Sequence, residues 1–556
     1  MMDNKSYLIE YKDIFDDKVQ HYTSYLKGIG KKEIVIFCSY FISTCIYGKG
    51  TAEIKYQINN WFSPSNSELF RSVLGKMANL KDKNITLLNI FNVLKILEYV
   101  IKNGPESNEI TNLEFEVQTF KAVLVLNQEF NLRDKIISRS TYDLDDNLKS
   151  QCLLMTIAFC YFDLMYFKSN EQEIVQFIKA YFLFDFIENH SDKTKTILKS
   201  FYSNQNVNHW KDYLKKYMPI FHVIINSDST RPIDLIVPEN GGYEENCKFL
   251  NSLILNNEYD IDEFDFITCR SKPFYNTEAG TYRIIHPLFV IEKLYNGLYF
   301  TLSNINDALP AKISNFRSFF CDEFSEKYLV YGILDKSFPK RFIKLSGQEI
   351  KAKVSGIIAE PDYYIRNNNQ IYLFESKDAL IDKETKQSHD FKRIETVLKT
   401  KIYYYLKDGI RKNIGLMQLI TNIKRILTNE CTWDSPTPSR TSIYPILLVH
   451  YNIYNTPGIN YLINTWFREE LIYLTKEGLK TDKIKDLVVI DINTFLLFHE
   501  RFQNNSLCLQ CLIDEYNKSH SNYLKSFSFF VSDYVNKKNY WQIPKLFSEL
   551  GMDLFN

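Results

Sequence analysis

Most informative for the fold is the stretch Gly356-Ile-Ile-Ala-Glu-Pro-Asp-Tyr-Tyr-Ile-Arg-Asn-Asn-Asn-Gln-Ile-Tyr-Leu-Phe-Glu-Ser-Lys377. β-Branched and aromatic residues fill its two arms, as they do in strands. Between the arms lie Asn367, Asn368 and Asn369, turn residues that tolerate a positive φ. The stretch therefore predicts a β-hairpin.

A turn centred on Asn368 and Asn369 fixes the register of this hairpin. Asp362 then lies opposite Glu375, and Glu360 lies opposite Lys377. Because side chains alternate along a strand, Glu360 and Asp362 share one face, as do Glu375 and Lys377. Three carboxylates and one ammonium group are expected to converge at one end of the hairpin.

Such a cluster is costly, because facing carboxylates repel one another and burial strengthens the repulsion. A divalent cation relieves it. Mg²⁺ prefers oxygen ligands and often uses one or two carboxylates together with waters and substrate phosphates. A lysine beside the metal can orient a water molecule or help to deprotonate it. These groups are the ones that metal-dependent phosphodiester hydrolysis requires.

Pro361-Asp362, followed after an interval by Glu375-Ser376-Lys377, resembles the PD-(D/E)xK nuclease superfamily. The resemblance implies a restriction-endonuclease-like fold with Mg²⁺ as cofactor and Mn²⁺ as a substitute. It also implies that Asp362, Glu375 and the backbone carbonyl of Ser376 hold the metal. Lys377 would position the attacking water.

The Glu-x-Lys pattern alone is weak, because it occurs five times in the chain. Only Glu375-Ser376-Lys377 closes a hydrophobic strand and follows the chain's single Pro-Asp pair by the length of a hairpin. The alternative interpretation is a surface hairpin whose charges are solvated.

Two flanking helices supply further candidates. The spacing of apolar residues predicts a helix over Phe316–Leu334, and in the superfamily such a helix often adds an acid to the metal site. Glu323 and Glu326 are the candidates, with Glu326 preferred beside the apolar face. Gln418, in a predicted helix over Ile414–Leu427, resembles the glutamine that follows the motif in RecB-like members, although it lies 41 residues beyond Lys377. The candidate metal ligands are Asp362, Glu375, Ser376, Glu326 and Glu360.

The chain after the motif predicts a mixed sheet. Phe391–Leu406 is predicted to be a helix, and the apolar runs Ile443–Tyr451 and Asp486–Asn493 are predicted to be buried strands. A helix over Ile459–Leu474 separates them, which makes a β-α-β unit. This order resembles the α-β-β-β-α-β core of the superfamily.

The fold class expected is multidomain α plus α/β. Residues 1–235 are predicted to form a helical accessory or interaction domain, and 236–310 a connecting subdomain with short strands at Phe264–Cys269 and Thr281–Ile285. Residues 311–500 form the nuclease-like domain and 501–556 a helical tail. Partner binding or homo-oligomerisation is assigned to the helical N-terminal half.

Composition narrows the class of protein. The 556 residues are 45% hydrophobic and 24% charged with a net charge of zero, so nucleic acid would be bound through local patches. The N-terminus lacks the apolar core of a signal peptide, which predicts a cytoplasmic protein without a membrane anchor. The 10 cysteines are therefore expected to be reduced thiols, and Cys508-x-x-Cys511 lacks a second pair at zinc spacing.

The function expected is an Mg²⁺-dependent endonuclease that hydrolyses phosphodiester bonds, most readily in DNA. A large non-catalytic half resembles the layout of restriction or anti-phage defence nucleases, which is analogy at fold level. Two alternatives stay open: a nuclease-fold interaction scaffold without chemistry, and an RNA-directed nuclease that uses the same metal chemistry.

Overall fold

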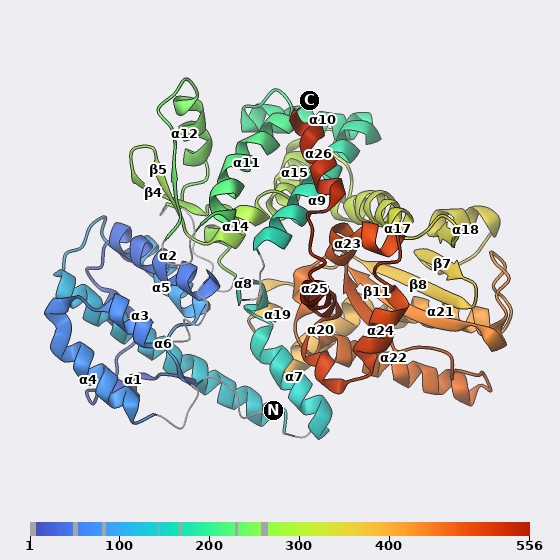
Figure 1. The fold of residues 1–556 in the computed structure, drawn as a ribbon, viewed down its shortest axis with the longest axis horizontal. Helices are drawn as coiled ribbons and strands as arrows, with labels where there is room; N and C mark the ends of the chain where they lie inside the picture. The colour runs from blue at the N-terminus through green and yellow to red at the C-terminus, as the bar shows by residue number, and fades with distance from the viewer. Residues whose placement is uncertain are drawn as a thin grey trace. The chain divides into compact units, whose positions relative to one another are not determined.

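A computed structural model describes residues 7–47, 54–80, 85–142, 144–165, 169–227, 232–256 and 265–555 (Figure 1). The chain packs into two compact units. The first comprises residues 1–139, 164–176 and 202–299, and the second comprises 140–163, 177–201 and 300–556. The division predicted at residues 235 and 310 does not follow these units, because two segments before residue 235 belong to the second.

Residues before 235 are helical, as predicted. The principal helices there are α2 (Lys31–Tyr47), α4 (Ser67–Ala78), α5 (Ile90–Asn103), α6 (Asn112–Ser140), α7 (Asp146–Ala158), α9 (Ser169–His190), α10 (Asp192–Gln205) and α11 (Trp210–Ile225). The following segment contributes an antiparallel sheet of β3 (Asp234–Ile236), β5 (Thr281–Ile284) and β4 (Phe274–Glu278). The strand predicted at Thr281–Ile285 is confirmed.

The strand predicted at Phe264–Cys269 is wrong over the residues that the structure describes, which begin at Asp265. Phe266 adopts a left-handed conformation with φ +52°, which interrupts an extended chain. Helix α13 (Ile267–Ser271) follows directly from it.

The second unit is built on a mixed five-stranded sheet with the order β12-β11-β8-β7-β6. Its strands are β6 (Ile343–Ser346), β7 (Tyr363–Asn367), β8 (Gln370–Lys377), β11 (Ser442–Val449) and β12 (Val488–Asp491). The first three pair antiparallel, whereas β8, β11 and β12 run parallel to one another. The predicted hairpin and the two predicted apolar strands are thus confirmed, and β6 was not predicted.

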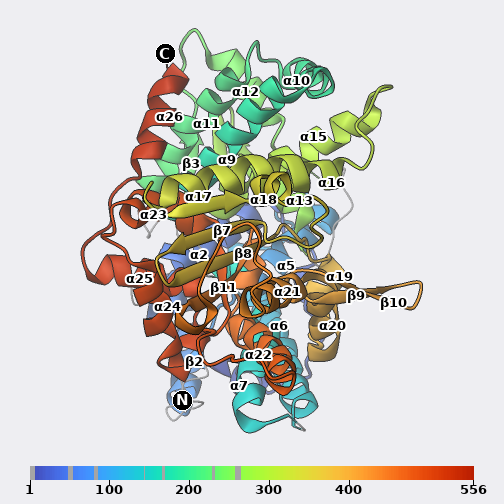
Figure 2. The ribbon, with the colours of Figure 1, turned by 90° about the vertical axis from the view of Figure 1, so that its right-hand side faces the viewer.

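Helices cover both faces of this sheet (Figures 1 and 2). The helices of the second unit from residue 316 onward are α16 (Phe316–Phe319), the π-helical segment η4 (Phe320–Val330), α17 (Tyr331–Ser337), α18 (Gly347–Lys353), α19 (Lys383–Lys386), α20 (Phe391–Ile402), α21 (Leu416–Leu427), α22 (Ile459–Lys476), α23 (Asn493–Gln503), α24 (Leu509–Asn517), α25 (Phe527–Lys537) and α26 (Lys545–Phe555).

The alternation of side chains along β8 decides what each face packs against. Ile371 and Leu373 belong to a core cluster with residues of α20, α21 and α22. Phe374, on the opposite face, packs against Phe338 and against Phe495 of α23, with ring centroids 6.2 and 6.0 Å apart. Strand β8 is therefore a central strand buried on both sides, as its nearly continuous apolar run predicts.

The helix predicted over Phe391–Leu406 ends early, at Ile402. Tyr404–Lys407 instead forms strand β9, which pairs antiparallel with β10 (Ile410–Asn413). Asp408 and Gly409 join the two strands with φ +53° and +74°, the positive values that a two-residue hairpin turn requires. Apolar spacing continues past the true helix end, so the pattern alone overextended the helix.

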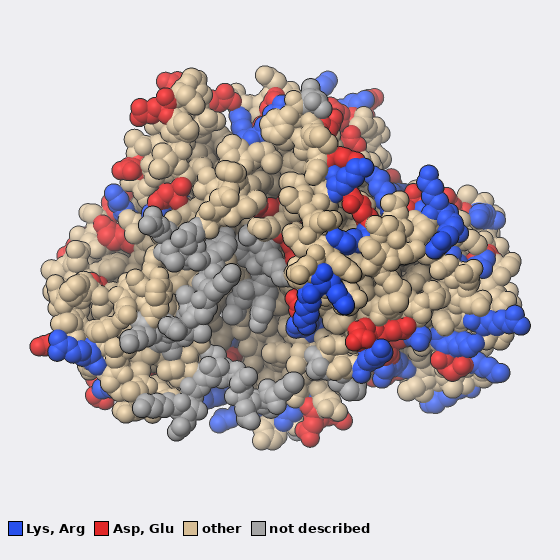
Figure 3. Space-filling model, in the orientation of Figure 1, with Lys and Arg blue, Asp and Glu red and all other residues tan. Residues whose placement is uncertain are grey.

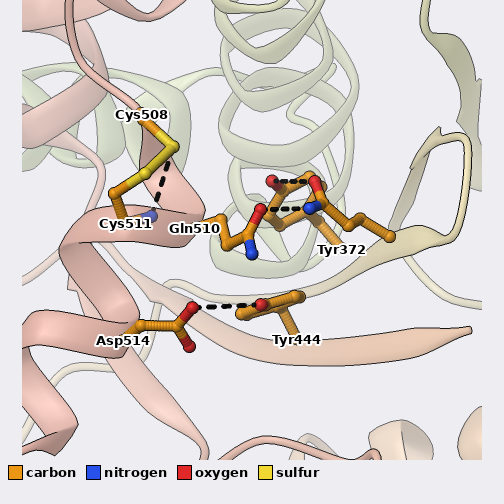
Figure 4. The surroundings of a disulfide bond; sticks show 7 residues. Tyr372, Tyr444, Cys508, Gln510, Cys511 and Asp514 are labelled. Carbon is orange, nitrogen blue, oxygen red and sulfur yellow. Dashed lines mark hydrogen bonds between the residues drawn. A yellow bond between two sulfur atoms is a disulfide. The ribbon is translucent and has the colours of Figure 1, made fainter.

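The expectation that all cysteines are reduced thiols is wrong for one pair. Cys508 and Cys511 form a disulfide at the start of α24 (Figure 4). Cys508 is the N-cap residue of that helix, and its sulfur also accepts a hydrogen bond from the Cys511 backbone N–H at 3.3 Å. Residues three apart at a helix start face one another, which brings the two sulfur atoms together.

Surface charge is mixed on the face drawn in Figure 3, where Lys and Arg side chains are interspersed with Asp and Glu, in keeping with the net charge of zero. Across the described ranges, every helix is too short or too polar to cross a membrane.

Candidate active site

The predicted hairpin register is confirmed. Residues Asn367 and Gln370 pair beside the turn, and Tyr363 pairs with Phe374 at the other end of the ladder. The next position along both strands sets Asp362 beside Glu375. The Asp362 carboxylate, through Oδ2, accepts a hydrogen bond of 2.6 Å from the backbone N–H of Ser376. The two candidate ligands therefore share one face of the sheet.

Both carboxylates are buried. Asp362 is 9% exposed and Glu375 is 0% exposed. Burial, with the Glu375 carboxylate adding to it, raises the pKa of Asp362 to about 8. Burial also raises the pKa of Glu375 to about 7, against the opposing effect of Lys377. The alternative of a surface hairpin with solvated charges is wrong, because these groups are withdrawn from water.

Lys377 lies on the same face as Glu375, at the end of β8. Its Nζ donates a hydrogen bond of 2.8 Å to Glu375 Oε1. Burial favours the neutral amine, but the carboxylates of Glu375 and Asp362 outweigh it and raise the pKa of Lys377 above its usual range. The side chain is therefore an ammonium ion at neutral pH, suited to orienting a water molecule or stabilising negative charge.

Glu326 joins the cluster from η4. Burial and the Asp362 carboxylate raise the pKa of Glu326 to about 7. Its Oε1 accepts a hydrogen bond of 2.7 Å from the Tyr331 hydroxyl, one helical turn further on. Glu323 instead forms an ion pair with Lys327. Of the two acids that the sequence offered, Glu326 is the one near Asp362.

The π-helical geometry of η4 is notable at this position. π-Turns are rare and frequently mark functional sites. Here the backbone N–H of Tyr331 donates to the carbonyl of Glu326, five residues before it. Ser325, the residue before Glu326, donates a hydrogen bond of 2.6 Å to Asp378 Oδ2, just beyond β8. This bond ties the helix that carries Glu326 to the strand that carries Glu375.

Glu360 lies at the edge of the cluster. It contributes to the raised pKa of Asp362, after larger effects from burial and Glu375. Its side chain also forms an ion pair of 2.6 Å with Lys351, which is largely exposed. Glu360 is thus an outer member with a competing partner.

Helix α21 reaches the cluster through its first residues, despite its distance along the chain. Gln418 Oε1 accepts a hydrogen bond of 2.9 Å from the backbone N–H of Gly415, which caps the helix. A Cβ atom on Gly415 would lie 3.3 Å from Lys377 Cε and 2.3 Å from the Ile402 carbonyl oxygen. Gly415, which is hydrogen-bonded to Gln418, therefore lies beside Lys377, and a side chain at this position would clash with Ile402.

Ser376 faces the opposite side of β8. Its hydroxyl shares a hydrogen bond of 2.9 Å with His450 Nε2, one residue beyond β11. Burial lowers the pKa of His450 to about 4, so its ring is neutral at pH 7. Sequence reasoning missed His450, Gly415 and Tyr331; a histidine directly after an apolar strand and a glycine at a helix start were the available signals.

Asp362, Glu375 and the Ser376 carbonyl offer oxygen atoms, the type of ligand that a hard divalent cation takes. Within the described part of the chain, Glu375 Oε2 is buried and has no hydrogen-bond partner. No group of three or more His, Cys, Asp or Glu residues in that part could hold a metal ion. Two carboxylates and a backbone carbonyl are fewer side-chain ligands than such a group, but Mg²⁺ often binds proteins through only one or two carboxylates together with waters. Asp362, Glu375 and Ser376 are the residues that would hold it.

Comparison of the chain with protein-family models, with curated proteins and with solved structures finds no match.

Proposed function

We propose that the chain is a divalent-cation-dependent endonuclease that hydrolyses phosphodiester bonds in DNA. One observation carries the proposal. Asp362 and Glu375 are buried on one face of a hairpin, Glu375 is hydrogen-bonded to Lys377, and its other carboxylate oxygen has no partner among the described residues. Buried, unsatisfied carboxylates are destabilising unless they serve a bound cation or a reaction.

The sheet supports a restriction-endonuclease-like fold for the second unit. A helix precedes three antiparallel strands, and a helical crossover then leads to the parallel strands β11 and β12. The candidate residues lie where β8 ends, at the same edge as the carboxyl ends of β11 and β12. In open α/β sheets, ligands bind at this edge.

The roles of the residues follow from their chemistry. Asp362, Glu375 and the Ser376 carbonyl would hold Mg²⁺ or Mn²⁺, and such a cation supplies charge stabilisation and an activated water when bound. The Lys377 ammonium would orient the attacking water and stabilise negative charge on the phosphate. Glu326 offers a further carboxylate, and Gln418 fixes the start of α21 against Lys377.

Cleavage assays test the proposal. Purified protein is incubated with plasmid DNA, genomic DNA and RNA in the presence of Mg²⁺, Mn²⁺ or EDTA. We expect DNA cleavage that EDTA abolishes. Asp362→Ala and Lys377→Ala should each reduce the rate by about 10²-fold or more, the usual cost of losing a charge stabiliser or a positioned catalytic group.

Glu384→Ala is the matched control, because Glu384 belongs to the neighbouring Glu-x-Lys sequence and is exposed in α19. It should cut at the wild-type rate. A wild-type protein that binds the cation but cuts neither nucleic acid would favour the interaction scaffold, and cleavage of RNA alone would favour the RNA-directed nuclease. Wild-type cutting by Lys377→Ala would show that the site is wrong.

A further inference from the structure

The hairpin formed by β9 and β10 projects from the second unit beyond α19 and α20 (Figure 2). Leu406 is 67% exposed and Ile410 is 61% exposed, so the hairpin carries large apolar side chains in contact with water. A two-stranded hairpin is marginally stable by itself. Exposed apolar side chains on such an arm suggest a surface that binds a partner.

The register of the hairpin separates its two faces. Ile410 pairs with Lys407, and Lys412 pairs with Tyr405, so these four side chains share one face. Tyr405 is 38% exposed, and both lysines are exposed. In the described part of the chain, neither lysine has an ion pair or a hydrogen-bonding partner for its side chain.

The other face is anchored to the body of the second unit. Arg411 lies over the Tyr404 ring, 4.2 Å from its centroid, and its Nη2 is 3.3 Å from Glu470 Oε1 of α22. The Glu470 contact holds the hairpin near its root, whereas Leu406 on this same face is exposed close to the turn. The face with Tyr405, Lys407, Ile410 and Lys412 has no such contact among the described residues. That set, called the arm face below, combines two cations with an aromatic and an aliphatic side chain.

The root of the hairpin adjoins the candidate active site. The backbone N–H of Ile414 donates a hydrogen bond of 3.1 Å to the carbonyl of Tyr403, which closes the base of the hairpin. Gly415, the next residue, is the one packed against Lys377. Each strand has four residues and so extends about 13 Å from this root, at about 3.3 Å per residue.

We propose that the arm face binds duplex DNA beside the active site. Lys407 and Lys412 contact backbone phosphates, and Tyr405 and Ile410 lie against sugars and base edges. The inference rests on the proposed nuclease function and specifies its substrate as double-stranded. A two-stranded ribbon fits the major groove of B-form DNA, which is about 12 Å wide. The deep, narrow major groove of duplex RNA does not admit it.

Binding without cleavage provides the test. Lys377→Ala protein in EDTA is titrated against a labelled DNA duplex, and fluorescence anisotropy is measured between about 50 and about 200 mM salt. Adding Lys407→Glu and Lys412→Glu should weaken binding by at least about 10-fold, and the slope of log affinity against log salt should fall by about 2, because each phosphate contact contributes about 0.9.

The matched control is Lys537→Glu with Lys538→Glu, which makes the same charge change at exposed lysines at the end of α25. It should bind DNA as the parent does, with both variants keeping the parent melting temperature. Equal losses in the two variants, wild-type binding by the arm variant, or a preference for duplex RNA would each overturn the inference. If the arm substitutions weaken DNA binding but the wild-type protein never cuts DNA, the nuclease proposal is contradicted and the arm proposal is not. If the wild-type protein cuts DNA but the arm substitutions leave binding unchanged, only the arm proposal is contradicted.

Discussion

Two hairpins of similar construction have opposite surroundings in this protein. The pairs β7–β8 and β9–β10 are both antiparallel, and each turns through two residues that include a positive φ, at Asn368 and at Asp408 and Gly409. The first is central in a five-stranded sheet, with Glu375 fully buried. The second is an isolated ribbon whose Lys407 and Lys412 are exposed.

The difference shows how covering a hairpin changes the chemistry of its charges. In β7–β8, burial raises the pKa of Asp362 and Glu375, so their ionised forms become costly and suited to a cation. In β9–β10, water solvates the lysines, so they serve better as mobile contacts to phosphate. The helices α20, α21 and α22, rather than the strands themselves, create this contrast.

Replacing a large apolar side chain by alanine should give the largest difference in stability between the two hairpins. Phe374→Ala removes a ring that packs against Phe338 and Phe495, and we expect a loss of about 3–5 kcal/mol in the free energy of unfolding. Leu406→Ala, in the exposed ribbon, should change it by less than about 0.5 kcal/mol. Urea denaturation of both variants measures the difference, and similar losses would contradict the contrast.

Glycine replacement should have a smaller, but still unequal, effect. Gly415→Ala places a methyl group 2.3 Å from the Ile402 carbonyl oxygen, so the start of α21 must shift. We expect a loss of about 1–3 kcal/mol from this clash, in addition to the cost of a side chain at the positive φ of +47°, and a slower cleavage rate because Lys377 moves. Gly409→Ala has open space around its Cβ and should lose only the left-handed preference, about 1–2 kcal/mol, with cleavage unchanged.

The melting temperature should depend on pH through the buried acids around the first hairpin. Because the pKa of Asp362 is about 8 and those of Glu375 and Glu326 are about 7, these three acids hold more protons in the folded than in the unfolded state between about pH 4 and about 8. His450, whose pKa burial lowers to about 4, opposes this effect below about pH 6.5, but by only one proton. Stability in EDTA should therefore fall as pH rises from about 5 to about 8.

Asp362→Asn should flatten this decline, since the amide does not titrate, whereas Glu384→Gln in exposed α19 should leave it unchanged. Differential scanning fluorimetry across this range gives the comparison. A wild-type protein that becomes more stable with rising pH would show that the carboxylates are not held in the buried arrangement.

Local sequence signals predicted the sheet and the carboxylate cluster better than the contacts that hold them in place. The asparagine turn and the alternation of side chains predicted the register that pairs Asn367 with Gln370, and apolar runs predicted β11 and β12. These features depend on neighbouring residues along one strand. Glu326 was preferred because it borders an apolar helix face, but only the structure shows that Glu326, and not Glu323, belongs to the cluster.

The features that were missed depend on contacts between distant segments. Strand β6 has only four residues, with little apolar pattern to reveal it. Gly415 is required by the approach of Ile402 and Lys377, and His450 by Ser376 on a neighbouring strand. The helix was predicted to continue through Tyr403–Leu406 because the aromatic residues there fit the spacing of a helix as well as that of a strand. Contacts between segments that are far apart along the chain leave no pattern in any short stretch of sequence.

The most direct test of the central claim is calorimetric titration of Mg²⁺ and Mn²⁺ into the wild-type protein, Asp362→Ala, Lys377→Ala and Glu384→Ala. The claim is that Asp362 and Glu375 hold the cation while Lys377 acts on water and phosphate. It predicts wild-type binding in Glu384→Ala, much of the affinity in Lys377→Ala, and a severe loss in Asp362→Ala, because a charged ligand to a strongly hydrated dication is gone. Binding of unchanged affinity by Asp362→Ala would contradict it.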